Sequence, residues 1–294
     1  MRSYLFAPGD SPDKMAKAIG CGTDVAVLDL EDSVAPDNKA AARKAAASVL
    51  KDVPRGGAQV YVRVNSFDTD LMEADLAAIA DGRPDGIMLP KSQSVADVIR
   101  LNGLLHELQV AAPEPGGLVK IIAIATETAA SLFQLGSYAG GGERLDALCW
   151  GAEDLSADLG AQSNVDEHGR YTGPYELART LCLVGARAAG LEPIDGIYGN
   201  FRDQDGLWDS CRRALRDGFS GKLAIHPAQV PIINRAFTPS AGDVERARRI
   251  VEAFAAAGNP GVIGLDGEML DKPHLERARK LLALADRYAR APLQ

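Results

Sequence analysis

The sequence predicts an α/β protein that folds as a (β/α)8 barrel, the TIM barrel, followed by a helical extension. Eight short β-like runs follow one another, and most are separated by alanine-rich stretches with helical spacing. Strands that alternate with helices indicate βαβ units and a parallel sheet. Several runs are continuously apolar, which is typical of strands covered on both faces. Eight such units in about 230 residues fit a barrel, whose usual length is ~250 residues.

The predicted strands cover Ser3–Pro8, Asp24–Asp32, Gln59–Asn65, Gly86–Lys91, Lys120–Glu127, Ala147–Asp154, Ile194–Asn200 and Lys222–Ile225. The predicted helices include Asp37–Leu50, Leu71–Ile79, Val95–Leu108 and Tyr175–Ala189. A doubly wound open sheet is the alternative fold. That fold usually carries a G-x-G-x-x-G fingerprint after its first strand, and the motif is absent from this sequence.

The chain divides into an expected barrel domain, residues 1–238, and an expected helical extension, residues 239–294. Ser240 is suited to cap a long helix, because serine oxygens accept hydrogen bonds from the first free backbone amides. A turn over Gly258–Gly261 follows, and a last helix is expected near Pro273. Two interpretations of this extension are open. Its helices either pack as structural elements or reach into a neighbouring subunit.

Composition excludes several classes of protein. The 294 residues include 46% hydrophobic ones, enough for a sizeable core, and the formal net charge is −8. Generic nucleic-acid binding needs a basic footprint, so we expect no nucleic-acid partner. No apolar run approaches the ~20 residues that span a bilayer, so we expect no membrane association. The N-terminal segment does not read as a signal peptide, and we expect a cytoplasmic protein.

The four cysteines do not form a C-x-x-C pair, and their neighbours are largely apolar or small. They are Cys21, Cys149, Cys182 and Cys211. We therefore expect free thiols in or near the core, in preference to a disulfide framework or a zinc site.

Charged and carboxamide residues stand where four of the predicted strands end. They are Glu31 and Asp32, Arg63 and Asn65, Glu127, and Glu153 with Asp154. Charges in a buried strand are costly unless they are paired or used. The carboxyl ends of parallel strands are also where ligands bind. A guanidinium and several carboxylates at this edge predict a metal-assisted site for an anionic substrate.

Glu127 and Asp154 end the predicted fifth and sixth strands, which are neighbours in a barrel. Two carboxylates on adjacent strand ends can share one hard cation. Mg²⁺ prefers one or two carboxylates, several waters and substrate oxygens. The alternative is that one of the two acids forms an ion pair with Arg63 or caps a loop.

Arg63 lies between valines in the run V-Y-V-R-V-N. Its planar guanidinium can grip a substrate carboxylate through two hydrogen bonds. It can also form a buried ion pair with Glu31 or Asp32, and both roles are compatible. We expect Glu31 and Asp32 to support the site from behind the residues that touch the substrate, and the same holds for Asp29.

Two further residues have competing interpretations. Lys91 follows the fourth predicted strand and is either a Schiff-base lysine or, as we favour, an electrostatic or structural cation. His226, in the run A-I-H-P, is either a general base or part of a loop wall, and the wall is favoured. The remaining histidines, including His274, stand in polar segments and are expected to be solvated.

These residues together resemble a known family. The runs R-S-Y-L-F-A-P-G-D, D-V-A-V-L-D-L-E-D-S-V-A-P-D-N-K-A-A-A-R, V-R-V-N, L-P-K, G-A-E-D-L-S-A-D-L-G, A-I-H-P-A-Q-V and M-L-D-K-P-H occur in order along nearly the whole chain. They resemble the citrate lyase beta-subunit-like branch of the HpcH/HpaI aldolase superfamily.

The resemblance implies a barrel with an extended C-terminal region and a homo-oligomer, a trimer or hexamer. It implies Mg²⁺ as cofactor and cleavage or formation of carbon–carbon bonds in 3-hydroxyacyl-CoA thioesters such as citryl-, malyl- or citramalyl-CoA, with an acyl-CoA and a 2-keto acid as small-molecule partners.

The resemblance also implies roles for individual residues. Glu127 and Asp154 match the metal ligands, with Glu127 also at the substrate, and Arg63 matches the arginine that holds the keto-acid carboxylate. Asp271 matches a catalytic acid that reaches an adjacent subunit's site. The coenzyme A surface includes the first-strand loop, which here contains Phe6, Pro8 and Lys14.

Three other functions fit the same motifs. One is a thioesterase that hydrolyses malyl-CoA without cleaving a carbon–carbon bond. Another is a citrate lyase beta subunit that acts on a carrier-bound thioester. The third is a catalytically silent CoA-binding scaffold. The sequence does not indicate which acyl-CoA and keto acid are used.

Overall fold

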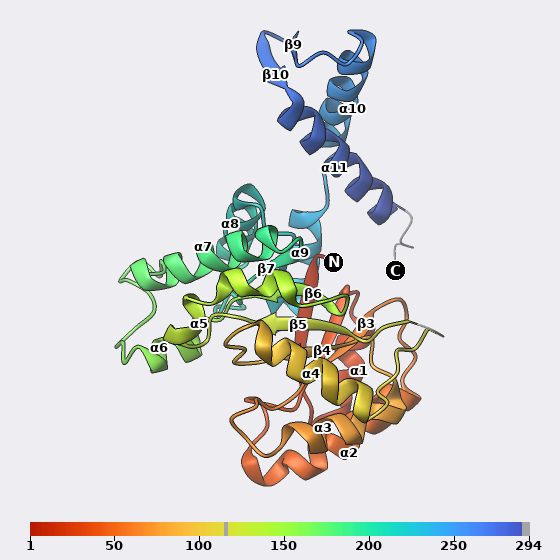
Figure 1. The fold of residues 1–294 in the computed structure, drawn as a ribbon, viewed down its shortest axis with the longest axis vertical. Helices are drawn as coiled ribbons and strands as arrows, with labels where there is room; N and C mark the ends of the chain where they lie inside the picture. Colours follow the sequence, from red (N-terminus) through yellow and green to blue (C-terminus); the bar gives the residue numbers. More distant parts are fainter. Residues whose placement is uncertain (115–116, 290–294) are drawn as a thin grey trace. The chain divides into compact units, whose positions relative to one another are not determined.

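The structure of the protein, a computed structural model, describes residues 1–114 and 117–289 (Figure 1). The chain forms two compact units, Met1–Asn234 and Arg235–Gln294, and each is described by itself. The division falls four residues before the boundary expected from the sequence.

The first unit is the predicted (β/α)8 barrel, which is confirmed. Its parallel strands are β1 Ser3–Pro8, β2 Val25–Asp29, β3 Gln59–Arg63, β4 Gly86–Leu89, β5 Lys120–Ile124, β6 Leu145–Cys149, β7 Glu192–Asp195 and β8 Gly221–Ala224. Each strand pairs with the next one in the sequence, and β8 pairs with β1, so the barrel is closed.

Helices lie outside these strands (Figure 1). The α-helices are α1 Pro12–Gly20, α2 Lys39–Asp52, α3 Met72–Ile79, α4 Val95–Glu107, α5 Ala129–Leu132, α6 Glu153–Asp158, α7 Gly173–Ala188, α8 Gln204–Asp217 and α9 Val230–Phe237. Short 3-10 turns are η1 Pro36–Asn38, η2 Ala80–Gly82, η3 Leu135–Gly140 and η4 Pro227–Gln229.

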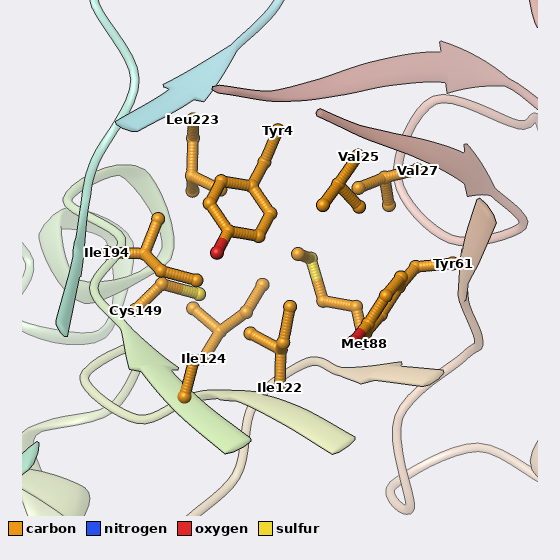
Figure 2. Packing of buried hydrophobic residues seen from close by; sticks show 11 residues of the cluster. Tyr4, Val25, Val27, Tyr61, Met88, Ile122, Ile124, Cys149, Ile194 and Leu223 are labelled. Carbon is orange, nitrogen blue, oxygen red and sulfur yellow. The ribbon is translucent and has the colours of Figure 1, made fainter. Parts of the chain in front are cut away.

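The inside of the barrel is a packed core (Figure 2). Alternate residues of each strand point inward, as the two-residue period of a strand requires. The buried cluster consists of Tyr4, Val25, Val27, Tyr61, Met88, Ile122, Ile124, Ala147, Cys149, Ile194 and Leu223. Since these side chains fill the interior, a ligand has room only above them, at the strand ends.

The predicted strands extended too far at their carboxyl ends. β2 ends at Asp29 instead of Asp32, and β5 ends at Ile124 instead of Glu127. The acidic residues leave the hydrogen-bonded ladder because their carboxylates bond to turn amides and to side chains of other strands. Glu127 and Asp154 therefore lie on a loop and in the first turn of α6, just beyond β5 and β6.

The expected free thiols are confirmed. Cys149, Cys182 and Cys211 are buried and Cys21 is half-buried, and all four are free. Burial raises the pKa of the Cys211 thiol to about 11, so this group is an unreactive part of the packing.

The second unit is a pair of helices with a β-hairpin. It contains α10 Ala241–Ala256, β9 Val262–Leu265, β10 Glu268–Asp271 and α11 Lys272–Ala289. Its core consists of Ala247, Ile250, Phe254, Leu270, Leu275 and Ala278. The predicted cap is confirmed, because the Ser240 side chain accepts a hydrogen bond from the Asp243 amide at 3.1 Å.

The hairpin was not predicted, although the sequence carries its signal. Asp266 and Gly267 connect β9 to β10, and both have positive φ angles, 52° and 81°. An Asp-Gly pair is the preferred sequence for such a two-residue turn. Within residues 1–114 and 117–289, no helix combines the length and the hydropathy needed to cross a bilayer.

A buried ion network joins the strands to the outer helices. Asp195, on β7, accepts hydrogen bonds from Lys222 Nζ at 2.6 Å, Arg179 Nε at 2.9 Å and Trp150 Nε1 at 2.8 Å. Burial alone would raise the pKa of Asp195, but Lys222 and Arg179 outweigh it and hold the pKa below its ordinary value. This network was not predicted from the sequence.

Replacing this carboxylate should destabilise the protein strongly. Asp195→Asn leaves the buried Lys222 without its counter-charge and Arg179 with only the partly exposed Asp217, so we expect a loss of roughly 3–5 kcal/mol in the free energy of unfolding, measured with urea. Asp217→Asn is the matched control, because Asp217 also bonds Arg179 but is 38% exposed. Its loss should stay below about 1 kcal/mol. Equal losses would contradict this assignment.

The wild-type protein and Asp195→Asn should also differ in their stability at acid pH. A carboxyl whose folded pKa is depressed contributes stability above its unfolded pKa, about 3.9, and that stability is lost as the pH falls toward its folded pKa. The wild-type protein should therefore lose stability below about pH 4 more steeply than Asp195→Asn.

Candidate active site

One pocket opens at the carboxyl ends of the barrel strands. Its lining comes from β1, β3, β5 and β8, from the loops that follow β2, β5, β6 and β7, from α6 and from the loop after it. The lining residues are Phe6, Asp32, Arg63, Ile124, Glu127, Trp150, Gly151, Ala152, Glu153, Asp154, Tyr171, Gly196, Ile197 and Leu223. Phe6, Ile124 and Leu223 also belong to the barrel core or pack against it, so the core forms the pocket floor.

Arg63, the last residue of β3, is held from the neighbouring strand. Its Nε and Nη2 donate to the two carboxylate oxygens of Asp29, both at 2.7 Å. The two residues are direct partners in the β2–β3 register, which places their side chains level on the same face. The guanidinium also lies over the Phe6 ring, 4.9 Å from its centroid.

One of the two ion pairs expected for Arg63 is confirmed, because Glu31 Oε2 lies 3.0 Å from Arg63 Nη1, whereas Asp32 Oδ2 is 4.0 Å away. The two hydrogen bonds to Asp29 were not predicted. Asp32 is exposed because it follows the strand into the loop. Burial alone would lower the pKa of Arg63, but hydrogen bonding to Asp29 raises it, so the guanidinium stays charged.

Glu127 is buried in the loop after β5. Its Oε2 accepts a hydrogen bond from the Lys91 amide at 2.5 Å. Burial, with the negative charges of Asp154 and Glu31, raises its pKa to about 8, although the Lys91 amide acts against this. Such a carboxyl is unstable as a lone anion and is stabilised by a nearby cation.

Asp154 is half-buried in the first turn of α6 and lines the same pocket as Glu127. The pair of acids predicted from adjacent strand ends is therefore together. Among residues 1–114 and 117–289, no three acidic, histidine or cysteine side chains converge on one point. Two carboxylates beside room for water and substrate are nevertheless a donor set that suits Mg²⁺.

Lys91 lies immediately beyond β4. Its Nζ is 2.6 Å from Glu31 Oε1, 3.3 Å from Asp154 Oδ1 and 3.5 Å from Asp32 Oδ2. Burial alone would lower the pKa of Lys91, but the carboxylates of Glu31 above all, then Glu127 and Asp154, raise it. A Schiff-base lysine needs a lowered pKa, so these contacts favour the electrostatic interpretation.

Glu31 lies between the two cations of the site. It contacts Arg63 and Lys91, and burial raises its pKa in spite of them. Lys39 Nζ donates to the carbonyls of Leu30 and Glu31 at 2.8 and 2.7 Å and so anchors the loop that carries the acids.

The residues expected at coenzyme A are spread out. Phe6 lines the pocket, whereas Pro8 ends β1 and Lys14 is exposed on α1, both outside the pocket lining. Gly9 follows Pro8 and approaches β2 closely, because a Cβ at this position would lie 2.6 Å from the Asp29 carbonyl oxygen. Glycine thus lets the loop after β1 pass close to β2, the strand whose Asp29 binds Arg63.

The aromatic wall of the pocket was missed from the sequence. Trp150 and Tyr171 line it, with their rings edge to face and centroids 4.9 Å apart. Trp150 lies within the predicted sixth strand, Ala147–Asp154, and directly follows β6, so its place near a strand end was a usable signal. Tyr171 lies in a polar loop between α6 and α7, and nothing in its local sequence points to the pocket.

His226 has the structural role that we favoured. Its Nδ1 accepts a hydrogen bond from the Ala228 amide at 3.1 Å and caps η4, and its ring stacks on Phe201 with centroids 4.7 Å apart. His226 is not among the residues that line the pocket.

Asp271 lies at the end of β10 in the second unit. Its Oδ1 is 2.5 Å from Nδ1 of His274, and this hydrogen bond lowers the pKa of Asp271. His274, expected to be solvated, is partly exposed and also pairs with Asp271. The i, i+3 spacing at the start of α11 brings the two side chains together.

Comparison with known proteins places this chain in a class of enzymes. Residues 194–289 match the profile described as "C-C_Bond_Lyase of the TIM-Barrel fold", so barrel and extension together fit the class of barrel carbon–carbon lyases. Residues 2–227 match the profile "HpcH/HpaI aldolase/citrate lyase". The chain belongs to the HpcH/HpaI aldolase/citrate lyase family, as its motifs suggested.

Individual relatives cover nearly the whole chain. A (3S)-malyl-CoA thioesterase of Cereibacter sphaeroides is 35% identical over 290 residues, which is 98% of this chain and 95% of the relative. The mitochondrial citramalyl-CoA lyase of Rattus norvegicus is 34% identical over 300 residues, 97% of this chain and 86% of the relative.

A solved structure is also similar. The CitE protein of Mycobacterium tuberculosis, in complex with magnesium, acetoacetate and coenzyme A, is 33% identical, with a TM-score of 0.78. The match covers 97% of this chain and 98% of that one.

The state of Lys91 can be tested chemically. If its ammonium is held protonated by Glu31 and Asp154, incubation with pyruvate and sodium borohydride should leave the intact mass of the protein unchanged. A Schiff-base aldolase treated in parallel serves as the positive control. A mass increase that is lost in Lys91→Arg would contradict the electrostatic role.

Proposed function

We propose that this protein is a Mg²⁺-dependent lyase that cleaves, or forms, a carbon–carbon bond of a 3-hydroxyacyl-CoA thioester, with an acyl-CoA and a 2-keto acid as the other reactants. The observation that carries the proposal is that Glu127 and Asp154 line one pocket with the guanidinium of Arg63. The family membership supports it, as do the similar citramalyl-CoA lyase and the CitE complex with magnesium and coenzyme A.

Glu127 and Asp154 are the residues that would hold the metal. When bound, Mg²⁺ would supply Lewis acidity and orientation at the oxygen that becomes the keto group. The fit rests on the donor set, because two carboxylates line one pocket beside room for water and substrate oxygens, which are ligands that Mg²⁺ prefers.

Arg63 would bind the carboxylate of the 2-keto acid portion. Asp29 fixes the plane of the guanidinium through two hydrogen bonds, so Arg63 presents a preorganised charge and loses little freedom when substrate binds. The floor formed by Phe6, Ile124 and Leu223 keeps the reacting carbons away from water, which strengthens each of these electrostatic contacts.

Asp271 of a neighbouring subunit would move the proton at the acyl-CoA carbon. In cleavage the substrate hydroxyl would lose its proton to water as its oxygen becomes the keto oxygen, and the carbon–carbon bond would break toward the thioester. The resulting enolate would take a proton from Asp271 in its carboxylic acid form. In condensation Asp271 removes that proton. Its pKa, lowered by His274, keeps the carboxylate ionised, which is the form that condensation needs. This role requires a homo-oligomer, proposed to be a trimer or hexamer.

A thioesterase is the second candidate. The similarity to the (3S)-malyl-CoA thioesterase of Cereibacter sphaeroides favours it, and its chemistry can use the same cation and arginine. The two functions differ in products, because a lyase releases acyl-CoA and keto acid, whereas a thioesterase releases free CoA and an intact hydroxy acid.

A substrate panel tests the proposed function directly. Malyl-CoA, citramalyl-CoA and citryl-CoA are each incubated with the enzyme and Mg²⁺, and keto acid and free CoA are followed separately. We expect keto acid to form at the rate at which the thioester disappears, with chelation by EDTA abolishing it. Free CoA without keto acid would replace the lyase by the thioesterase.

The two metal-binding carboxylates have testable effects on affinity. Glu127→Gln and Asp154→Asn each remove one anionic ligand, so Mg²⁺ binding measured by calorimetry should weaken at least ~100-fold, and turnover should fall with it. The exposed loop residue Glu167 supplies the control, and Glu167→Gln should bind Mg²⁺ like the wild type. Unchanged affinity in Glu127→Gln would remove this metal site.

Mixed oligomers test the proposed place of Asp271. Arg63→Ala and Asp271→Asn should each be inactive when pure, since each lacks one part of every site. After unfolding and refolding together, some sites combine an intact barrel with an intact neighbouring extension, and we expect partial activity. No recovery, although mass spectrometry shows mixed oligomers, would mean that Asp271 does not act across subunits.

A further inference from the structure

Lys91 touches the two proposed metal ligands with different parts of one residue. Its backbone amide donates to Glu127 Oε2, and its ammonium is 3.3 Å from Asp154 Oδ1. Its φ angle is 50°, in the left-handed region that residues other than glycine rarely adopt. This conformation costs free energy, and a strained residue at such a place is a reason to look for a functional constraint.

The ammonium lies among carboxylates in a poorly solvated place. Besides Asp154 it contacts Glu31 at 2.6 Å and Asp32 at 3.5 Å, and only 23% of the Lys91 side chain is exposed. Partly buried charges are screened weakly, so these contacts act at close to full strength in ordinary salt.

The charges around the pocket leave Lys91 a distinct task. Arg63 is already engaged through two of its nitrogens by Asp29 and through the third by Glu31. Lys91 is the cation that the structure places on Asp154. A divalent ion bound by Glu127 and Asp154 would therefore compete with the Lys91 ammonium, which already contacts Asp154.

We propose that Lys91 is a positioning residue that serves as a built-in counter-cation, which holds Asp154 and Glu31 together before the metal binds and competes with Mg²⁺ for Asp154. It would thereby set the affinity of the site for the metal, weakening binding in exchange for acids that are already in place. This inference rests on the proposed Mg²⁺ site.

The sign of the effect follows from charge alone. Removing the ammonium makes the pocket more negative, which favours any cation that binds there. Mg²⁺ carries twice the charge of a proton, so the gain for the metal exceeds the gain for a proton on Glu127. Loss of Lys91 should therefore tighten Mg²⁺ binding even where the metal has to displace a proton.

The experiment is a calorimetric Mg²⁺ titration of the substrate-free protein. Lys91→Gly is the informative variant, because glycine adopts the left-handed conformation freely and retains the amide that holds Glu127. We expect its dissociation constant for Mg²⁺ to be at least ~10-fold lower than that of the wild type. Without metal, the Tm of Lys91→Gly should be lower than the wild-type Tm. Addition of Mg²⁺ should raise the Tm of Lys91→Gly by more than it raises the Tm of the wild type.

Two controls isolate the charge. Lys91→Arg retains a cation and should bind Mg²⁺ like the wild type. Lys51→Met removes an exposed lysine far along the sequence, paired only with the exposed Asp81 among the ion pairs of the described chain, and should change nothing. If Lys91→Gly does not fold, Lys91→Asn gives the same comparison, because asparagine also tolerates the left-handed region.

The outcomes separate this inference from the proposed function. If the wild type itself does not bind Mg²⁺ at millimolar concentration, the proposed function fails. If the wild type binds and the neutral Lys91 variants bind with equal or weaker affinity, the counter-cation is overturned and the metal site stands. Tighter binding with a lower metal-free Tm supports it.

Discussion

The pair formed by Asp29 and Arg63 across β2 and β3 is the interaction on which the rest of the site depends. A guanidinium at the top of a packed barrel needs a counter-charge, and the strand register supplies one that is level with it. Asp29 satisfies two nitrogens of Arg63, so the third is left to Glu31 and to the pocket. Because the arginine is fixed in this way, Glu31 is fixed too, and Glu31 in turn holds Lys91.

The site can therefore be understood as a chain of alternating charges that ends at the metal-binding acids. Asp29, Arg63, Glu31, Lys91 and Asp154 follow one another through contacts of 2.6 to 3.3 Å. Carboxylates outnumber cations along this chain, and Glu127 adds another. Burial first, and then the charges of Asp154 and Glu31, raise the pKa of Glu127. A divalent cation is the simplest way to balance the excess of carboxylates, which links the electrostatics of the barrel mouth to the proposed chemistry.

The sequence predicted the barrel because the strand–helix alternation is a property of each segment, and it predicted the acids because strand ends share one edge. It predicted the contact of Glu31 with Arg63 but not the two hydrogen bonds from Arg63 to Asp29, since these depend on the register between two strands. Tyr171 was missed for a similar reason, because a loop residue reaches the pocket only through the tertiary fold. The ends of β2 and β5 were predicted too far along the chain. The charged residues there directly follow the apolar run in the sequence, but they no longer take part in the hydrogen bonds between strands.

Trp150 connects the buried ion network around Asp195 to the wall of the pocket. Its indole nitrogen is bound by Asp195, which Lys222 and Arg179 hold ionised between the strands and the helices. Its ring packs against Tyr171 and forms the pocket wall. A buried ion network is weak evidence of stabilisation by itself, because desolvation offsets much of its attraction. Here the network has a second consequence, because it fixes the orientation of the aromatic wall of the pocket. The cost of burying three charges is therefore offset by a more rigid pocket.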